Sequence, residues 1–198
     1  MSYIVKRTTG TAGAPLFLTF HGTGGTEEQF HSFAEKLLPG AHVVSPRGDV
    51  SENGAARYFK RAAEGVYDMD DLSERTHAMA DFIASEVSQT GASRTIGLGY
   101  SNGANILASV AMNQGDLVDD LILMHPLIPF TPTPQRCLKG RRVLITAGEN
   151  DPICPTELTQ QLATYLTAQG VDVTVHWHNG GHGIAQSEVE AVEKFLAA

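Results

Sequence analysis

GYSNG at Gly99–Gly103 fits G-x-S-x-G, the pattern of a serine held on a tight turn between a strand and a helix. The backbone turns so sharply in this pattern that a side chain at either glycine would meet the neighbouring strand or helix. The flanking residues agree, because 94–100 predicts a buried strand and 104–112 predicts a helix. The stretch therefore predicts that Ser101 presents its hydroxyl at the amino end of a helix.

Strand-like and helix-like segments alternate along the rest of the chain. The expected strands are 15–20, 41–45, 121–124, 142–146 and 171–177, and the expected helices are 27–38, 72–90, 156–169 and 187–196. This alternation predicts the α/β class, with a mostly parallel sheet of about six or seven strands and helices on both faces. At 198 residues, the chain predicts a single domain over 1–198 and no separate lid domain.

The composition narrows the partners and the location. A formal net charge of −8 and the lack of a basic run argue against nucleic acid and membrane surfaces as partners. No stretch is apolar enough for a secretory signal or a membrane span. The two cysteines, Cys137 and Cys154, fit a reducing cytoplasm better than a disulfide scaffold, so a cytoplasmic location is expected.

Two polar residues complete a candidate catalytic set with Ser101. A serine hydroxyl is a weak nucleophile that needs a base and a group to orient that base. Asp151 and His182 follow Ser101 in the order that accompanies a G-x-S-x-G turn, and both come just after expected strands. Because parallel strands end at one edge of a sheet, we expect Ser101, Asp151 and His182 to meet there. Asp172, His176 and His178 are the rival acid and bases.

Backbone amides are expected to bind the oxyanion that forms during acyl transfer. One donor is the N–H of Asn102, which follows the serine, and the other is the N–H of Thr23 in the glycine-rich loop His21–Gly25. His21 itself is interpreted as a structural histidine that bonds to nearby backbone.

The segment 45–71 is expected to fold over the site and shape the substrate pocket, because long irregular connections are commonly functional. Its candidate substrate-binding residues are Arg47, Arg57, Tyr58 and Phe59. Surface salt bridges for the arginines and a loop-pinning role for the aromatic rings are the alternatives. His125 follows an expected strand and either lines the pocket or packs. No metal site is expected, since His176, His178 and His182 lack matching ligands at a convincing spacing.

Taken together, these motifs resemble those of α/β-hydrolases, and more narrowly those of the phospholipase/carboxylesterase family. Within that family the chain is similar to small bacterial carboxylesterases linked to quinone stress and, more distantly, to acyl-protein thioesterases. The matching pieces are HGTGGTEE at His21–Glu28, SPRG at Ser45–Gly48, ENG at Glu52–Gly54, RYF at Arg57–Phe59, GYSNGAN at Gly99–Asn105, HP at His125–Pro126, GENDPIC at Gly148–Cys154 and GGH at Gly180–His182.

The resemblance implies a bacterial serine carboxylesterase in which Ser101 is the nucleophile, His182 the general base and acid, and Asp151 the orienting group. It implies a small-molecule ester substrate and no cofactor, and the family's frequent dimers leave a homodimer as one option. The thioesterases usually carry glutamine in place of Asn102 and an apolar residue in place of Thr23, so long-chain acyl substrates do not follow from the resemblance.

Three other functions compete with the small-ester hypothesis. The first is an acyl thioesterase or lysophospholipase with the same three residues. The second is a non-catalytic ligand-binding module of the same fold. The third, metal-dependent oxygen chemistry on quinones, ranks lowest because such chemistry needs a metal or flavin, for which the sequence shows no site.

Overall fold

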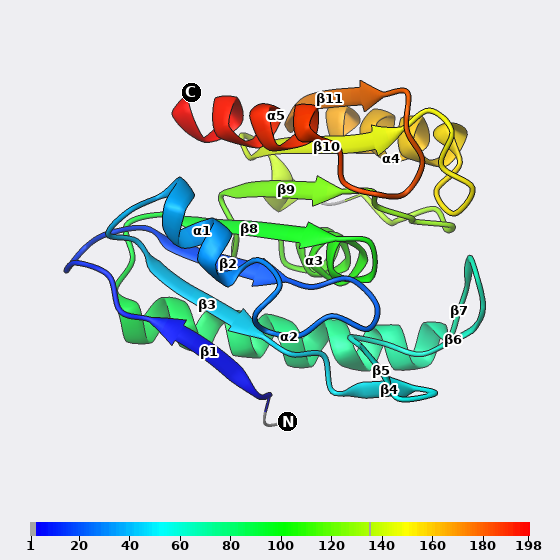
Figure 1. Ribbon diagram of the computed structural model, residues 1–198. Helices are drawn as coiled ribbons and strands as arrows, with labels where there is room; N and C mark the ends of the chain where they lie inside the picture. Colours follow the sequence, from blue (N-terminus) through cyan, green and yellow to red (C-terminus); the bar gives the residue numbers. More distant parts are fainter. Residues whose placement is uncertain (1–2, 135) are drawn as a thin grey trace.

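A seven-stranded sheet forms the centre of the computed structural model, which describes residues 3–134 and 136–198 (Figure 1). The strand order is β1-β3-β2-β8-β9-β10-β11, and every neighbouring pair is parallel except β1 and β3. The strands are β1 (Val5–Thr8), β2 (Leu16–Phe20), β3 (His42–Pro46), β8 (Thr95–Tyr100), β9 (Asp120–Met124), β10 (Arg142–Gly148) and β11 (Asp172–His178). The predicted mostly parallel α/β sheet is confirmed.

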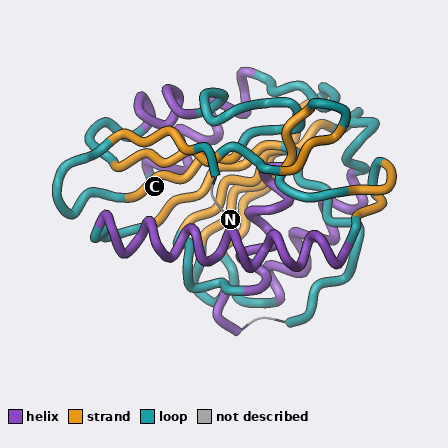
Figure 2. The backbone as a smooth tube through the Cα atoms, turned by 90° about the horizontal axis from the view of Figure 1, so that it is seen from below, coloured by secondary structure: helices purple, strands orange, loops and turns teal. Residues whose placement is uncertain are grey.

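Two layers of helices cover the sheet (Figures 1 and 2). One layer holds α1 (His31–Leu37) and α5 (Gln186–Ala197), and the other holds α2 (Met69–Thr90), α3 (Asn102–Asn113) and α4 (Thr156–Ala168). A short 3₁₀ helix, Arg136–Leu138, precedes β10. None of the helices in the described part of the chain combines the length and apolarity required to span a bilayer.

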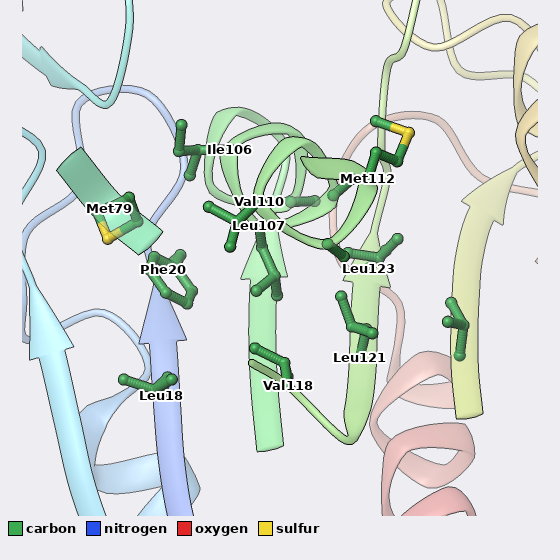
Figure 3. Close-up of a cluster of buried hydrophobic side chains, with 14 of the residues drawn as sticks. Leu18, Phe20, Met79, Ile106, Leu107, Val110, Met112, Val118, Leu121 and Leu123 are labelled. Carbon is green, nitrogen blue, oxygen red and sulfur yellow. The ribbon is translucent and has the colours of Figure 1, made fainter. Parts of the chain in front are cut away.

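The two-residue period of the strands divides the core between these layers. Leu16, Leu18 and Phe20 of β2 lie in the cluster with α2, α3 and α4, whereas Phe17 lies in the cluster with α1 and α5. Figure 3 shows the larger cluster, in which side chains of α3 such as Leu107 point toward the strands. Burial on both faces explains why these strands are nearly continuous apolar runs.

Two helix starts differ most from the prediction. The helix expected at 27–38 begins at His31, because Glu27 and Gln29 bind elsewhere: Glu27 pairs with Arg47, and Gln29 Oε1 accepts from Gly22 N. The helix expected from residue 72 begins at Met69, where the Asp68 side chain caps it by accepting from Asp71 N.

The segment 45–71 forms two hairpins beyond the carboxyl ends of the central strands (Figure 1). The first pairs β4 (Val50–Glu52) with β5 (Ala55–Arg57), and the second pairs β6 (Arg61–Ala63) with β7 (Val66–Tyr67). Asn53 and Gly54 make the two-residue turn of the first hairpin with φ values of 51° and 90°. The segment thus has more regular structure than its sequence predicts.

Candidate active site

Ser101 lies on a strained turn between β8 and α3. Its φ of 52° and ψ of −117° are unusual for a residue with a side chain, and its N–H donates to Met124 O at 2.8 Å. A Cβ on Gly99 would lie 2.5 Å from Gly103 O, and one on Gly103 would lie 2.3 Å from Phe20 O. The two glycines are therefore required by close packing at this turn, as the sequence pattern predicts.

Three side chains from distant parts of the chain form one hydrogen-bonded row. His182 Nε2 lies 2.9 Å from Ser101 Oγ, and His182 Nδ1 lies 2.8 Å from Asp151 Oδ2. The other oxygen of Asp151, Oδ1, accepts from Ile153 N at 2.8 Å and from Cys154 N at 3.1 Å. The residues predicted to meet at the sheet edge thus lie within hydrogen-bonding reach, with the carboxylate fixed from both sides.

The two predicted oxyanion-binding residues border the same cavity as Ser101. The side chains of both bond to the segment 45–71: Thr23 Oγ1 accepts from Arg57 Nη1 at 2.7 Å, and Asn102 Oδ1 accepts from Tyr58 N at 2.8 Å. Gly22 allows close approach of the loop, since a Cβ there would lie 2.7 Å from the Tyr100 ring. The segment 45–71 therefore braces both residues.

The cavity at Ser101 has a volume of about 190 Å³. This is below the roughly 300–1,000 Å³ of ordinary ligand sites. The second hairpin supplies much of its wall, as expected for the segment 45–71. The lining residues are Thr23, Arg57, Arg61, Glu64, Tyr67, Tyr100, Ser101, Asn102, Asn105, Leu127, Ile153, Cys154 and His182.

Larger hollows lie elsewhere, among them one of about 360 Å³ beside Ala84 and Arg94. One of about 410 Å³ borders α5 and β11, and one of about 560 Å³ borders α4 and the residues Ile128–Pro132. None of these hollows is lined by Ser101, Asp151 or His182. The smaller cavity is the one bordered by a serine hydroxyl bonded to a histidine, which makes it the candidate active site.

Four of the five predicted substrate-binding residues do not line this cavity. Arg57 does, with a nearly buried guanidinium that also lies 3.6 Å from Glu52. Arg47 instead pairs with Glu27. Tyr58 and Phe59 are buried in the core, where Tyr58 Oη donates to Pro46 O at 2.8 Å, so these two rings pin the loop.

His125 is the fourth of these residues, and it lies behind Asp151 rather than at the pocket. Its side chain is fully buried, with Nδ1 at 2.8 Å from Asp151 Oδ2 and Nε2 at 3.1 Å from Glu188 Oε1. Of the two options for His125, packing is what the structure shows. The backbone of His125, with φ of 51°, is also held in an unusual conformation at the end of β9.

The remaining histidines take structural positions. His21 accepts from Gly48 N at 2.9 Å through Nε2 and contacts Gly22 O through Nδ1, as its structural interpretation predicts. His176 Nε2 lies 3.1 Å from Ser187 Oγ, and His178 Nε2 lies 3.2 Å from Glu188 Oε2.

Glu188 is the residue of this network that the sequence did not reveal. It belongs to the first turn of α5 and is fully buried. Oε1 accepts from Thr146 Oγ1 at 2.5 Å, and Oε2 accepts from Ala185 N at 2.6 Å. Its side chain thus connects α5 to β10 beside the row of reactive groups.

Burial and hydrogen bonding shift the pKa values of this network in opposite directions. Burial raises the pKa of Asp151, but hydrogen bonds from His182 and His125 outweigh it and hold the pKa below its usual value. Glu188 behaves alike, since burial raises its pKa but the contact with His125 and the hydrogen bond from Thr146 outweigh burial and lower it. Burial would lower the pKa of His125, yet the carboxylates of Glu188 and Asp151 raise it.

Two groups of side chains bring potential metal-ligand atoms within 4.8 Å of one another, His125 with Asp151 and His182, and His125 with His178 and Glu188. In the second group, His178 Nδ1 accepts from Gly180 N at 3.1 Å, so the ring proton belongs on Nε2. In the first group, His182 Nδ1 and His125 Nδ1 both face the same Asp151 oxygen as donors. These contacts fit a hydrogen-bonded network in which the Nδ1 atoms of His125 and His182 both donate to Asp151.

Comparison with known proteins places the chain among hydrolases. The model of the Dienelactone hydrolase family matches residues 14–197. The Bacillus subtilis (strain 168) protein named "Putative hydrolase MhqD" is 41% identical over 197 residues, which cover 98% of this chain and 97% of that protein.

Solved structures agree closely with the fold. The protein Atu2452 of Agrobacterium tumefaciens str. C58, whose function is unknown, is 55% identical with a TM-score of 0.94 and covers 98% of this chain and 96% of its own. The Bacillus cereus carboxylesterase is 35% identical with a TM-score of 0.91, over 98% of this chain and 93% of its own. The predicted resemblance to α/β-hydrolases and bacterial carboxylesterases is confirmed.

Proposed function

Because the chain belongs to the dienelactone hydrolase family of α/β-hydrolases and is an ester hydrolase, we propose that it cleaves small carboxylic esters through an acyl intermediate on Ser101. The observation that carries this proposal is the row of hydrogen bonds from Ser101 Oγ through His182 to Asp151. In this row the serine has a base within 2.9 Å, and the base has an orienting carboxylate on its far nitrogen.

The proposed reaction has two halves. In the first, His182 Nε2 takes the proton of Ser101 as Oγ attacks the ester carbonyl, and the amides of Thr23 and Asn102 bind the oxyanion. The C–O bond to the leaving group then breaks, and His182 gives its proton to the departing alcohol or phenol. In the second half, water attacks the acyl-serine with His182 as base, which releases the acid and restores the hydroxyl.

The cavity supports a short and polar substrate. Its volume of about 190 Å³ leaves little room for a long acyl chain, and its wall includes Arg57, Asn105 and Glu64. Asn105 is held in place, since its Nδ2 donates to Tyr67 Oη at 2.8 Å and its Oδ1 accepts from Leu127 N at 2.7 Å.

Replacing the nucleophile tests the proposal. We expect Ser101→Ala to keep the fold and to lower kcat/KM for p-nitrophenyl acetate by at least about 10³-fold, because the attacking atom is lost. The matched control is Ser109→Ala, which removes a hydroxyl from the same helix where it bonds only to Thr76 in the described contacts. A fluorophosphonate should add one mass label to the wild type and none to Ser101→Ala. Equal turnover by Ser101→Ala and Ser109→Ala would reject the proposal.

The choice of substrate separates the alternatives. A suitable substrate panel contains esters with acyl chains from C2 to C16 and the matching thioesters. It also contains dienelactone, the cyclic ester for which the family is named. The proposal expects short esters to be hydrolysed fastest. A preference for long chains would favour the thioesterase or lysophospholipase alternative, and lack of both labelling and turnover would favour a binding module.

A further inference from the structure

His125 connects the orienting carboxylate of the site to a second buried carboxylate. We propose that His125 is a positioning residue, an imidazolium that holds Asp151 and limits the basicity of His182. The inference rests on the proposed function, because it assigns a role within the same site. The positive charge of His125 is inferred from the position of each proton in the network.

The contacts of His125 are sealed from solvent. The side chains of His125, Asp151 and Glu188 are all 0% exposed. The imidazole lies between the two acids, with Nδ1 at 2.8 Å from Asp151 and Nε2 at 3.1 Å from Glu188. The second contact is not aligned as a hydrogen bond, so it offers mainly attraction between opposite charges.

The contact with Asp151 shows where the first proton of the His125 ring lies. An ionised carboxylate only accepts, and Asp151 Oδ2 lies against a ring nitrogen of His182 and of His125. His125 Nδ1 therefore carries a proton. If Nε2 were bare, its lone pair would face a carboxylate oxygen of Glu188 without water, which is repulsive. A proton on Nε2 turns this contact into an attraction.

The surroundings of Glu188 support the same conclusion. Its oxygens receive the Thr146 hydroxyl and the Ala185 amide, both of which stabilise the ionised form. His178 Nδ1 accepts the Gly180 N–H, so His178 is neutral with its proton on Nε2 toward Glu188. His178 Nε2 thus faces the carboxylate at 3.2 Å without an aligned hydrogen bond and brings no full charge.

The other groups that face His125 are neutral or belong to the row itself. The Tyr100 ring stands edge-on at 5.8 Å, and Cys154 Sγ donates to His125 O at 3.3 Å. Burial raises the pKa of both Tyr100 and Cys154, so neither supplies a charge near neutral pH. Among the described groups around the two carboxylates, His125 is therefore the one that offsets part of their charge.

The positive charge of His125 acts on the base. The rings of His125 and His182 are 5.1 Å apart, centre to centre, and both bond to the same Asp151 oxygen. A cation at that distance disfavours a second proton on His182. We therefore expect the acid limb of catalysis to lie at lower pH with His125 charged than without that charge.

The pH dependence of kcat/KM tests this role. We expect His125→Gln, which keeps a donor toward Asp151 but removes the charge, to move the acid limb upward by about 1–2 pH units. The matched control is His178→Gln, which alters a neighbour of the same carboxylate without changing charge and should leave the midpoint in place. An unmoved midpoint in His125→Gln, or equal movement in both variants, would overturn the proposal.

A second readout does not need catalytic activity. Nitrogen-15 NMR of the full chain carrying Ser101→Ala should show both ring nitrogens of His125 protonated near neutral pH. A His125 ring with a single proton near neutral pH would overturn the inference even if the enzyme is active. If instead the NMR result holds while Ser101→Ala keeps full turnover, the serine mechanism fails and the charge assignment stands.

Discussion

Gly103 lies directly behind the strained backbone of Ser101, where α3 crosses the end of β2. A glycine in a helix ordinarily destabilises it, by roughly 0.5–1 kcal/mol relative to alanine. Here the opposite result is expected, since an added Cβ would lie 2.3 Å from Phe20 O and 2.5 Å from His21 O. Both neighbours are backbone atoms, which cannot rotate away as a side chain can.

We therefore predict that Gly103→Ala lowers the free energy of unfolding by about 1–3 kcal/mol and displaces Ser101. Chemical denaturation measures the first effect and the kcat of ester hydrolysis the second. Gly183→Ala is the control, because a Cβ at Gly183 meets nothing within 4 Å. The close-packing argument fails if the two alanine variants are equally stable.

The residues that sequence reasoning found and missed differ in a physical way. Ser101, Asp151 and His182 follow apolar strands, and parallel strands bring their carboxyl ends together, so their meeting could be predicted. Glu188 lies in a helix whose other acids, Glu190 and Glu193, are exposed. Its sequence neighbourhood is that of a solvated helix face, and only the packing of α5 on the sheet buries it.

Among the elements, the β6–β7 hairpin is tied to the rest of the site through one phenol. Tyr67 Oη donates to Leu127 O at 2.7 Å and accepts from Asn105 Nδ2 at 2.8 Å. These bonds link the hairpin to α3 and to the loop after β9. Because Tyr67 and Asn105 both line the cavity, the anchor controls the wall facing the substrate.

Removing this hydroxyl leaves a donor and an acceptor unpaired. We predict that Tyr67→Phe costs about 1–3 kcal/mol of unfolding free energy and raises KM for short esters. Tyr165→Phe provides the same chemical change at an exposed bond to Thr133 O, and it should cost less and leave KM unchanged. Chemical denaturation measures the loss of unfolding free energy in both variants, and steady-state kinetics measures the change in KM. A larger loss or a larger KM change in Tyr165→Phe would contradict the anchoring role.

The elements that the sequence did not predict are short. β1 has the sequence VKRT, and its pairing with β3 is antiparallel at the sheet edge. The strands of the two hairpins have two or three residues each. Such segments are too short to show an alternation of apolar and polar residues from which a strand could be predicted. Their strand structure depends on pairing with distant strands or on turn geometry. The long apolar strands and α2, by contrast, could be predicted to within a few residues.

At the scale of the whole molecule, the buried network couples folding to pH. Asp151 and Glu188 have lower pKa values in the folded than in the unfolded protein. They therefore stabilise the fold fully above their unfolded pKa values near 4, and this stabilisation is lost as the pH falls through their folded pKa values. His125 has a raised pKa, so its contribution is complete below about 6.5 and is lost as pH rises through the folded value.

The network should thus stabilise the protein most between about pH 4.5 and 6.5. We predict that the wild type exceeds His125→Gln in unfolding free energy most clearly in this range, with a difference that narrows toward alkaline pH. Urea denaturation of both proteins across pH measures it. A difference that is constant, or that grows as pH rises, would contradict a charged His125.

Glu188 on α5 completes a set of groups whose first member, Ser101, lies far upstream in the chain. During synthesis the serine emerges well before its acid, its base and the final helix. A nascent polypeptide that has reached only α3 or β9 therefore carries an inert alcohol. Under the proposed mechanism, Ser101 meets its base and the supporting Glu188 only after β11 and α5 have been synthesised.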